Sequence, residues 1–343
     1  MKRLNIFLLL VVAVILAACG SDKEAEGSGS NSGSDKVYKL KVAHSSAATN
    51  DRLENSLQEF KKSIEESSDG RISIETYPNS QLGGEREALE GVQNGSIEMA
   101  VISTGPFAGF SKAMMVLDLP YIFKDSEQAF SILDGEFGDE LFEKLNAETG
   151  MRGLGWGENG IRHVANNTKE VLTPQDMKGL KIRTQENQAH MDMIKAFGGN
   201  ATPIAFNELY SSLQQGVIDG YENPFSLIVG MKFYEVTKYM TLTNHVFGAY
   251  AFVINDDVYN SMPEDLQEIL AEEVAKWEQV ERKMNQDQEI EGRKVMEEHG
   301  VKITELTDEQ YEEFQKLAQP VTESYREVVG EETYDSLMEK LGE

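Results

Sequence analysis

The sequence predicts an α/β fold built from two units of alternating strands and helices. Segments in which apolar and polar residues alternate, as in strands, are separated by segments whose apolar residues recur every three to four positions, as in helices. This rhythm is typical of crossover connections and therefore of a largely parallel sheet. One long amphipathic segment near the C-terminus adds a helix that is longer than a small domain is wide.

The first unit follows residue 36. Its predicted strands are residues 37–43, 71–77 and 98–103, and its predicted helices are residues 55–67 and 85–93. Ligands of such sheets bind beyond the carboxyl ends of the strands. Those ends are His44 with Ser45, residues 78–85, and Ser103 with Thr104, so we expect part of a binding site there.

The second unit begins near residue 160. Its predicted strands are residues 161–165 and 180–183, and its predicted helices are residues 189–197 and 208–215. Residues 249–254 resemble the buried strands of the first unit, so we expect the chain to cross back there. Domain I is then predicted to hold residues 36–160 and about 249–285, and domain II residues 161–248 and about 286–343.

The long amphipathic segment starts after Pro263 and reaches about His299. A helix of roughly 35 residues is about 50 Å long, which predicts that it braces both domains. Gly292 predicts a bend or break in it.

The N-terminus predicts export. Lys2 and Arg3 precede an apolar run at residues 6–18, which is shorter than the roughly 20 residues that a spanning helix needs. Leu-Ala-Ala-Cys at residues 16–19 matches the bacterial lipobox, so residues 1–18 are predicted to be a lipoprotein signal peptide and Cys19 the lipidated residue. The polar residues up to 35 form a flexible tether. The alternative is an ordinary cleavage site with an incidental cysteine.

This export signal places the mature protein outside the cytoplasm, anchored to the membrane through Cys19, in a periplasm or on the outer face of the cell. Cys19 is the only cysteine, so no internal disulfide can form. The 32 basic and 59 acidic residues give a net charge of −27, which excludes nucleic acid as a partner. The acidic residues of the last third are interpreted as solvated helix faces.

Arginine and aromatic residues indicate the chemistry of the site. Arg183 follows a short strand, where its planar guanidinium can present two parallel donors to a carboxylate. Arg162 follows a glycine-rich passage that lets it enter the same cleft, although a surface arginine paired with a carboxylate is the alternative. Phe206 precedes a helix, where its ring can cover a ligand.

Other chemistries are disfavoured. Gly155, Gly157 and Gly160 have dinucleotide-loop spacing, but strand-like residues rather than a helix follow them, so no cofactor is expected. The five histidines show no metal-binding pattern, and no nucleophile motif is present in the sequence. We therefore expect a binding protein rather than an enzyme.

The chain resembles the DctP-type solute-binding proteins of tripartite ATP-independent periplasmic (TRAP) transporters. The motifs that carry the resemblance cover essentially all of the chain after the tether: YPNSQLGGEREALEGVQNGSIEMA (77–100), LDLPYIF (117–123), NGIRHVANN (159–167), MKGLKIRTQENQ (177–188), PIAFNELYSSLQQGVIDGYENP (203–224), KFYEV (232–236) and TNH (243–245).

The resemblance implies a two-domain clamshell, like a periplasmic binding protein, with crossing hinge strands and a long helix along both domains. It also implies that Arg183 pairs with the substrate carboxylate, that Arg162 assists, and that Asn223 contacts the ligand. Phe206 matches a covering aromatic residue and Glu85 an acidic contact from the other lobe. Ser103 stands where sialic-acid binders carry a glutamate, which argues against sialic acid.

The expected ligand is a small organic acid, either a sugar acid such as a uronate or aldonate, or a C4-dicarboxylate. Glu85, Arg86, His44 and Asn223 offer mixed donors and acceptors, which favours the hydroxylated sugar acid. A monomer that hands its ligand to the TRAP permease subunits is expected. The competing interpretations are an extracytoplasmic enzyme that acts on carbohydrate acids, and the binding protein of an ATP-driven importer.

Overall fold

The computed structural model describes residues 36–342, which belong to one compact unit. The predicted signal peptide (residues 1–18), Cys19 and the tether lie outside the described residues. Within residues 36–342, no helix is long and apolar enough to cross a membrane.

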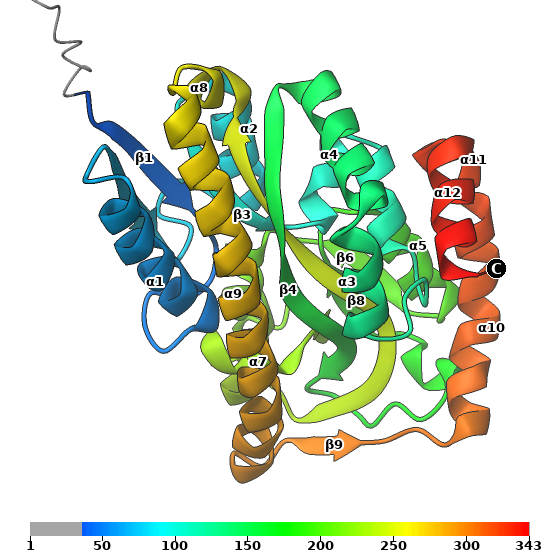
Figure 1. The fold of residues 1–343 in the computed structure, drawn as a ribbon. Coiled ribbons are helices and arrows are strands. Elements are labelled where there is room, and N and C mark those ends of the chain that lie inside the picture. Colours follow the sequence, from blue (N-terminus) through cyan, green and yellow to red (C-terminus); the bar gives the residue numbers. More distant parts are fainter. Residues whose placement is uncertain (1–35, 343) are drawn as a thin grey trace, which may run out of the picture. The chain divides into compact units, whose positions relative to one another are not determined.

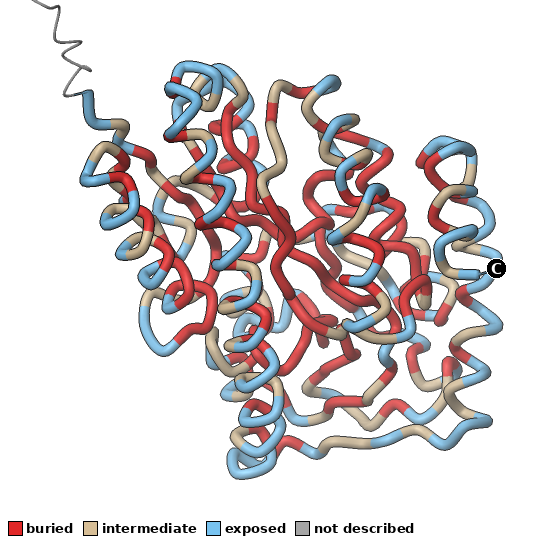
Figure 2. The backbone as a smooth tube through the Cα atoms, in the orientation of Figure 1, coloured by how far each residue is buried: buried red, intermediate tan, exposed pale blue. Residues whose placement is uncertain are grey.

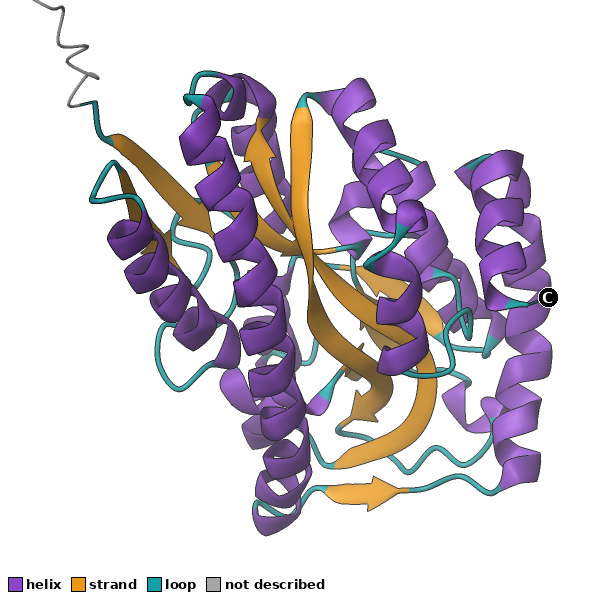
Figure 3. Cartoon of the chain, in the orientation of Figure 1, coloured by secondary structure: helices purple, strands orange, loops and turns teal. Residues whose placement is uncertain are grey.

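One mixed sheet runs through the described chain, with helices on both of its sides (Figure 3). The strands follow the order β2-β1-β3-β8-β4-β7-β5-β6, and β9 pairs with β8. Their bounds are β1 Tyr38–Ala43, β2 Ile72–Tyr77, β3 Met99–Ser103, β4 Met151–Asn166, β5 Lys181–Thr184, β6 Asn200–Pro203, β7 Gly220–Asn223, β8 Tyr239–Asn255 and β9 Lys302–Thr304.

The two ends of this sheet are parallel and its middle is antiparallel. At the first end β1 pairs with β2 and β3, and at the second end β5 pairs with β6 and β7, all in parallel. Between them β8 runs antiparallel to both β3 and β4, and β4 runs antiparallel to β7. The α/β prediction is confirmed, and the parallel pairing holds at the two ends. We call β1–β3 the first half of the sheet and β5–β7 the second half.

The middle strands are much longer than the sequence predicts. Expected strands at residues 161–165 and 249–254 are parts of β4 and β8, which have 16 and 17 residues. Their pairing shifts register between Gly153 and Gly155, between Glu158 and Gly160, and between Arg162 and Val164. Gly160 has a φ of +112°, a conformation that disfavours side chains. These irregularities interrupt the alternation of apolar and polar residues that marks a strand. The full lengths of β4 and β8 could therefore not be predicted from the sequence.

The helices pack against both faces of the sheet (Figure 1). Their bounds are α1 Arg52–Ser67, α2 Glu85–Asn94, α3 Ser126–Leu133, α4 Glu136–Thr149, α5 Gln188–Ala196, α6 Leu209–Gln214, α7 Phe225–Gly230, α8 Asp256–Asn260, α9 Glu264–Glu298, α10 Asp308–Ser324, α11 Arg326–Val329 and α12 Glu331–Leu341. Short 3-10 turns include η1 Gly105–Gly109, η2 Ala113–Asp118 and η4 Phe206–Glu208.

Side-chain caps mark the starts of α1 and α5. The Asp51 carboxylate accepts hydrogen bonds from the backbone of Leu53 and Glu54 at the start of α1. The Asn187 amide oxygen does the same for Ala189 and His190 at the start of α5. Such caps satisfy backbone donors that the first helical turn leaves unpaired, and therefore fix where each helix begins.

The predicted long helix is confirmed as α9, whose 35 residues pack against α1 and α7. Of the bend or break predicted at Gly292, the break is wrong, because α9 continues through this residue. This glycine instead makes room for α7: a Cβ at residue 292 would lie 3.0 Å from the Cβ of Phe225.

Four apolar clusters cover the sheet, whose strands form the buried centre in Figure 2. Two pack on the first half, one beneath α1 and the N-terminal part of α9, the other around α2, α3 and α4. Two pack on the second half, around α6 and α7 and around α5 and α10. The division into two domains stays a prediction. The apolar residues of α11 and α12 join the cluster around α2, α3 and α4.

Candidate functional site

The carboxyl ends of β3 and β7, together with residues that follow β1 and β5, line one small cavity, which in this structure is too narrow to admit a water molecule. Five of the residues expected at the site line it, and four more were not expected. The expected five are Ser45, Glu85, Ser103, Phe206 and Asn223; the others are Asn159, Gln185, Leu227 and Tyr250. The cavity therefore lies beyond the parallel strand ends, where ligands of such sheets are expected.

Ser45, Glu85 and Ser103, which we call the acceptor cluster, come from the first half of the sheet. Glu85 is the first residue of α2, and its Oε1 accepts hydrogen bonds from Ser45 Oγ at 3.2 Å and from Ser103 Oγ at 3.1 Å. Burial raises the pKa of Glu85, while the charge of Arg183 and the two serine hydrogen bonds act in the opposite direction. An acidic side chain is therefore held in the cavity wall by two hydroxyl donors.

Arg183 lies on β5 in the second half and is 1% exposed. Its Nε donates to the carbonyl oxygen of Ile204 at 2.7 Å, and its guanidinium carbon lies 5.8 Å from the centre of the Phe206 ring. Its Nη1 is buried and has no hydrogen-bond partner among residues 36–342. Burial lowers the pKa of Arg183 to about 10; Arg162 adds to this effect and Glu222 opposes it.

Arg162 lies on β4 and is held by a buried carboxylate, Glu222 of β7. Its Nε donates to Glu222 Oε2, and its Nη2 donates to Glu222 Oε1 at 3.0 Å and to Asn223 Oδ1 at 2.7 Å. The alternative of a surface arginine paired with a carboxylate is wrong about the surface, because Arg162 is buried, but the pairing with a carboxylate is present. Its Nη1 is buried and without a partner in the described chain.

Asn223 completes this group from the end of β7. The pairing of His163 with Asn223 brings the end of β7 beside β4, and Pro224 then turns the chain into α7. Asn223 Oδ1 accepts from Arg162, whereas its Nδ2 is buried and unpartnered within residues 36–342. We call Arg162, Arg183 and Asn223 the donor cluster. The two arginines do not line the cavity themselves, but each touches a residue that does.

Unpaired buried donors need an acceptor. Each one left without a partner costs roughly 1–3 kcal/mol, and more if the group is charged. Arg162 Nη1, Arg183 Nη1 and Asn223 Nδ2 all meet this description within the described chain. The arrangement is suited to an anion rich in acceptor oxygens, and the planar arginine fork matches a carboxylate.

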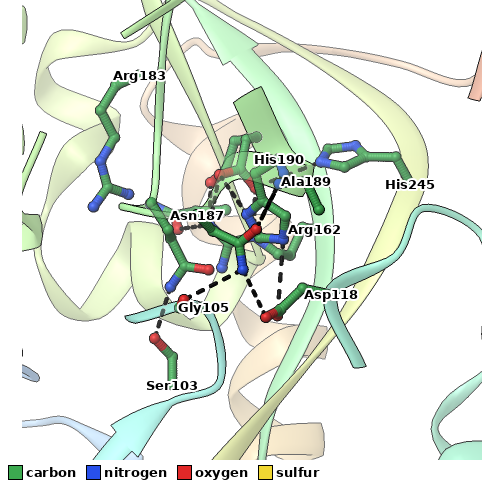
Figure 4. Close-up of polar contacts among 12 residues, drawn as sticks. Ser103, Gly105, Asp118, Arg162, Arg183, Asn187, Ala189, His190 and His245 are labelled. Carbon is green, nitrogen blue, oxygen red and sulfur yellow. Dashed lines mark hydrogen bonds and ion pairs between the residues drawn. The ribbon is translucent and has the colours of Figure 1, made fainter. Parts of the chain in front are cut away.

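Behind the donor cluster lies a second buried polar network (Figure 4). Asn187 donates to Asp118 Oδ2 at 2.8 Å and to the carbonyl oxygen of Gly105 at 3.2 Å. His190 lies 3.8 Å from Asp118 and 3.9 Å from Glu222, and burial lowers its pKa to about 3. This network ties α5 in the second half to η1 and η2, which follow the first half.

Two expected site residues lie elsewhere. His44 is buried, but its Nε2 bonds Glu54 at 2.8 Å and it does not line the cavity. Arg86 follows Glu85 on α2, yet its side chain is half exposed and pairs with Glu90. Consecutive helical residues point about 100° apart, which is why Glu85 faces inward and Arg86 outward.

Sequence reasoning missed Gln185 and Glu222 as parts of the site. Gln185 follows Arg183 by two residues, so it lies on the same side of the extended chain, and its Nε2 donates to Ser103 Oγ at 2.6 Å. Glu222 directly precedes Asn223 in the sequence. An acidic residue next to an expected site residue was the signal that could have indicated a partner for the candidate arginines. Nothing in the local sequence indicated Tyr250 or Asn159.

Comparisons with known proteins identify the family. A family model described as bacterial extracellular solute-binding protein, family 7 (DctP), matches residues 42–328. The chain is 34% identical to the 2,3-diketo-L-gulonate-binding periplasmic protein YiaO of Escherichia coli, over 73% of this chain and 76% of that protein.

Solved structures show the same fold. The sugar acid binding protein DctPAm from Advenella mimigardefordensis, in complex with galactonate, matches with a TM-score of 0.86 at 30% identity, over 89% of this chain and 98% of that one. A TRAP periplasmic solute binding protein from Sulfurospirillum deleyianum with bound succinate matches with a TM-score of 0.83 at 30% identity, over 88% and 99%.

Proposed function

The chain belongs to the DctP family of TRAP solute-binding proteins, whose members are binding proteins and not enzymes, and we propose that this one captures a small organic acid through Arg183. One observation carries the proposal: Arg183 is buried beside the cavity with an Nη1 that has no partner in the described chain. A sugar acid or a C4-dicarboxylate would supply the missing acceptor. Relatives described as binding 2,3-diketo-L-gulonate, galactonate and succinate support this class of ligand.

The other residues take their roles from their places. Arg162 and Asn223 assist Arg183 from the second half of the sheet, and Phe206 covers the ligand. Glu85, Ser45 and Ser103 contact it from the first half. His44 and Arg86 have other partners in this structure, so we assign the ligand contacts to the residues above.

Closure around the ligand is the proposed mechanism. A ligand that bridges residues of both halves binds the closed state better than an open one, and so shifts the population toward it. We propose two domains with the predicted boundaries, which move about β4 and β8, and a monomer that presents its closed face to the TRAP permease. This domain division rests on the strand and helix pattern and on the family.

Removal of Arg183 tests the ligand assignment. An acid from a panel of sugar acids and dicarboxylates should stabilise the wild-type protein by about 2.7 kcal/mol at a hundredfold excess over its dissociation constant. Arg183→Ala should abolish this stabilisation, which thermal unfolding measures. Arg293→Ala changes an exposed arginine and serves as the control. Stabilisation by neutral or cationic solutes only would contradict the proposal.

We further propose that Cys19 carries the lipid anchor and that residues 1–18 are removed as its signal. The lipobox pattern at residues 16–19 supports this. Intact-mass measurement of the membrane-extracted protein should find a diacylated N-terminal cysteine, and Cys19→Ser should release the protein from the membrane fraction. An unmodified cysteine in a membrane-bound protein would refute the anchor.

A further inference from the structure

Glu85 is held in the cavity wall as a hydrogen-bond acceptor. The Gln185 side-chain nitrogen can only donate, and it donates to Ser103 Oγ at 2.6 Å. The proton of Ser103 is therefore free for Glu85 Oε1, 3.1 Å away, to which Ser45 also donates. The hydrogen bonds therefore run in one direction, from Gln185 to Ser103 and from Ser103 to Glu85, and this direction makes the Glu85 carboxylate the acceptor.

The buried polar atoms at the cavity that have no hydrogen-bond partner in the described chain are of two kinds, donors and acceptors. The donor cluster offers N–H groups: Arg183 Nη1, Arg162 Nη1 and Asn223 Nδ2 are all buried and unpartnered in the described chain. The cavity also offers an acceptor, since the Oδ1 of Asn159, which lines it, is equally unpartnered. A ligand that accepts hydrogen bonds would satisfy the donor cluster, and a ligand that donates them would satisfy Asn159 and Glu85.

A hydroxylated acid with one carboxylate meets both demands. Its carboxylate accepts from the donor cluster, and its hydroxyl groups donate to Glu85 and Asn159. A dicarboxylate satisfies only the first demand, because its second carboxylate brings acceptors and negative charge toward the Glu85 carboxylate. Like charges placed against each other across an interface are strongly unfavourable.

We propose that Glu85 makes this site select acids with one carboxylate and several hydroxyl groups, such as aldonates, against C4-dicarboxylates. The inference rests on the proposed function and assigns the selectivity of the same cavity. Specificity of this kind comes from a repulsive contact with the wrong ligand as well as from attractive contacts with the right one. Sites built to bond a hydroxyl group reject analogues that lack it by large factors.

Calorimetric titration of the full mature protein at pH 7.5 tests the selection. The probes are erythronate, gluconate and galactonate on one side and the hydroxyl-free dicarboxylates succinate and fumarate on the other. We expect the best monocarboxylate to bind wild-type protein at least about 100-fold more tightly than any of the dicarboxylates. Glu85→Gln removes the charge at nearly constant volume and should narrow this ratio at least about tenfold, with succinate binding gained.

Glu90→Gln is the matched control, because it makes the same change on an exposed residue of α2 and should leave the ratio as in wild type. Equal binding of dicarboxylates and hydroxy acids by wild-type protein would overturn the inference while leaving the proposed function intact. An unchanged ratio in a folded Glu85→Gln variant would do the same. If no acid of either kind binds wild-type protein, the proposed function fails together with this inference. The wild-type ratio decides the matter even if the variant does not fold.

Discussion

The acceptor cluster lines the cavity, whereas the donor cluster reaches it only through Asn223, and the two clusters differ in how far the protein itself satisfies their hydrogen-bonding groups. Glu85 Oε1 accepts from both Ser45 and Ser103, and Ser103 in turn accepts from Gln185. In the donor cluster, each of the three side chains keeps a buried N–H group without a partner in the described chain. The acceptor cluster is thus satisfied by hydrogen bonds from the protein, one of which comes from Gln185 in the second half of the sheet, whereas the donor cluster keeps donors that the described chain does not satisfy.

Glu85 of the acceptor cluster and Glu222, which pairs with Arg162 of the donor cluster, also differ in their pKa shifts. Burial raises the pKa of Glu85, and the opposing charge of Arg183 does not reverse that effect. Burial would also raise the pKa of Glu222, but the charge of Arg162 and hydrogen bonds from His245 and Arg162 bring it well below the usual range. Glu222 is therefore the ion-pair partner of Arg162, whereas Glu85 accepts hydrogen bonds from two neutral serine hydroxyls.

We expect the largest loss of stability from a variant that removes Glu222, the ion-pair partner of Arg162 in the donor cluster. Glu222→Gln removes one partner of a buried ion pair and leaves the Arg162 charge uncompensated, which should lower the free energy of unfolding by about 3–5 kcal/mol. Urea unfolding without ligand measures it. Glu297→Gln breaks an exposed glutamate–arginine pair and should cost less than about 1 kcal/mol. Equal losses in the two variants would contradict the role of Glu222.

The same variant has a characteristic pH dependence. The folded pKa of Glu222 lies below its ordinary value of 4.5, so its stabilisation is complete above that value and is lost as the pH falls through the folded pKa. The stability gap between wild type and Glu222→Gln should therefore be constant near neutrality and narrow as the pH drops below about 4.5. A gap that widens on acidification would reverse the assigned direction.

We expect a smaller effect, on ligand affinity, from changes to Phe206 beside Arg183. Phe206 lies 5.8 Å from the Arg183 guanidinium, and such contacts contribute about 0.5–2 kcal/mol. Phe206→Leu should weaken binding of the best acid roughly three- to tenfold, whereas Phe206→Tyr keeps the ring and should retain most of the affinity. Calorimetry of both variants tests this; a loss as large as that of Arg183→Ala would give Phe206 a larger role than a cover.

Local patterns predicted most of the fold. The alternating strands and helices of the first half appear within a few residues of their expected bounds, and α9 has the expected length. The lengths of β4 and β8 could not be read, because register shifts and glycines interrupt their alternation. The unbroken course of α9 at Gly292 depends on its packing against Phe225, a contact between segments far apart in the sequence.

The site was predictable where it follows strand ends. Ser45, Ser103 and Asn223 come from such ends, and Glu85 and Phe206 begin a helix and a short turn beside them. The resemblance to a known family supplied their roles. What the sequence could not reveal is which polar groups already have partners: that Glu222 holds Arg162 and Glu54 holds His44 follows only from the three-dimensional structure.

The position of a bound acid tests the central claim most directly. A crystal structure of the protein with its tightest-binding acid should place a ligand carboxylate within hydrogen-bond distance of Arg183 Nη1, with Asn223 Nδ2 also donating to the ligand. A carboxylate bound elsewhere, with Arg183 Nη1 still unpartnered, would contradict the account.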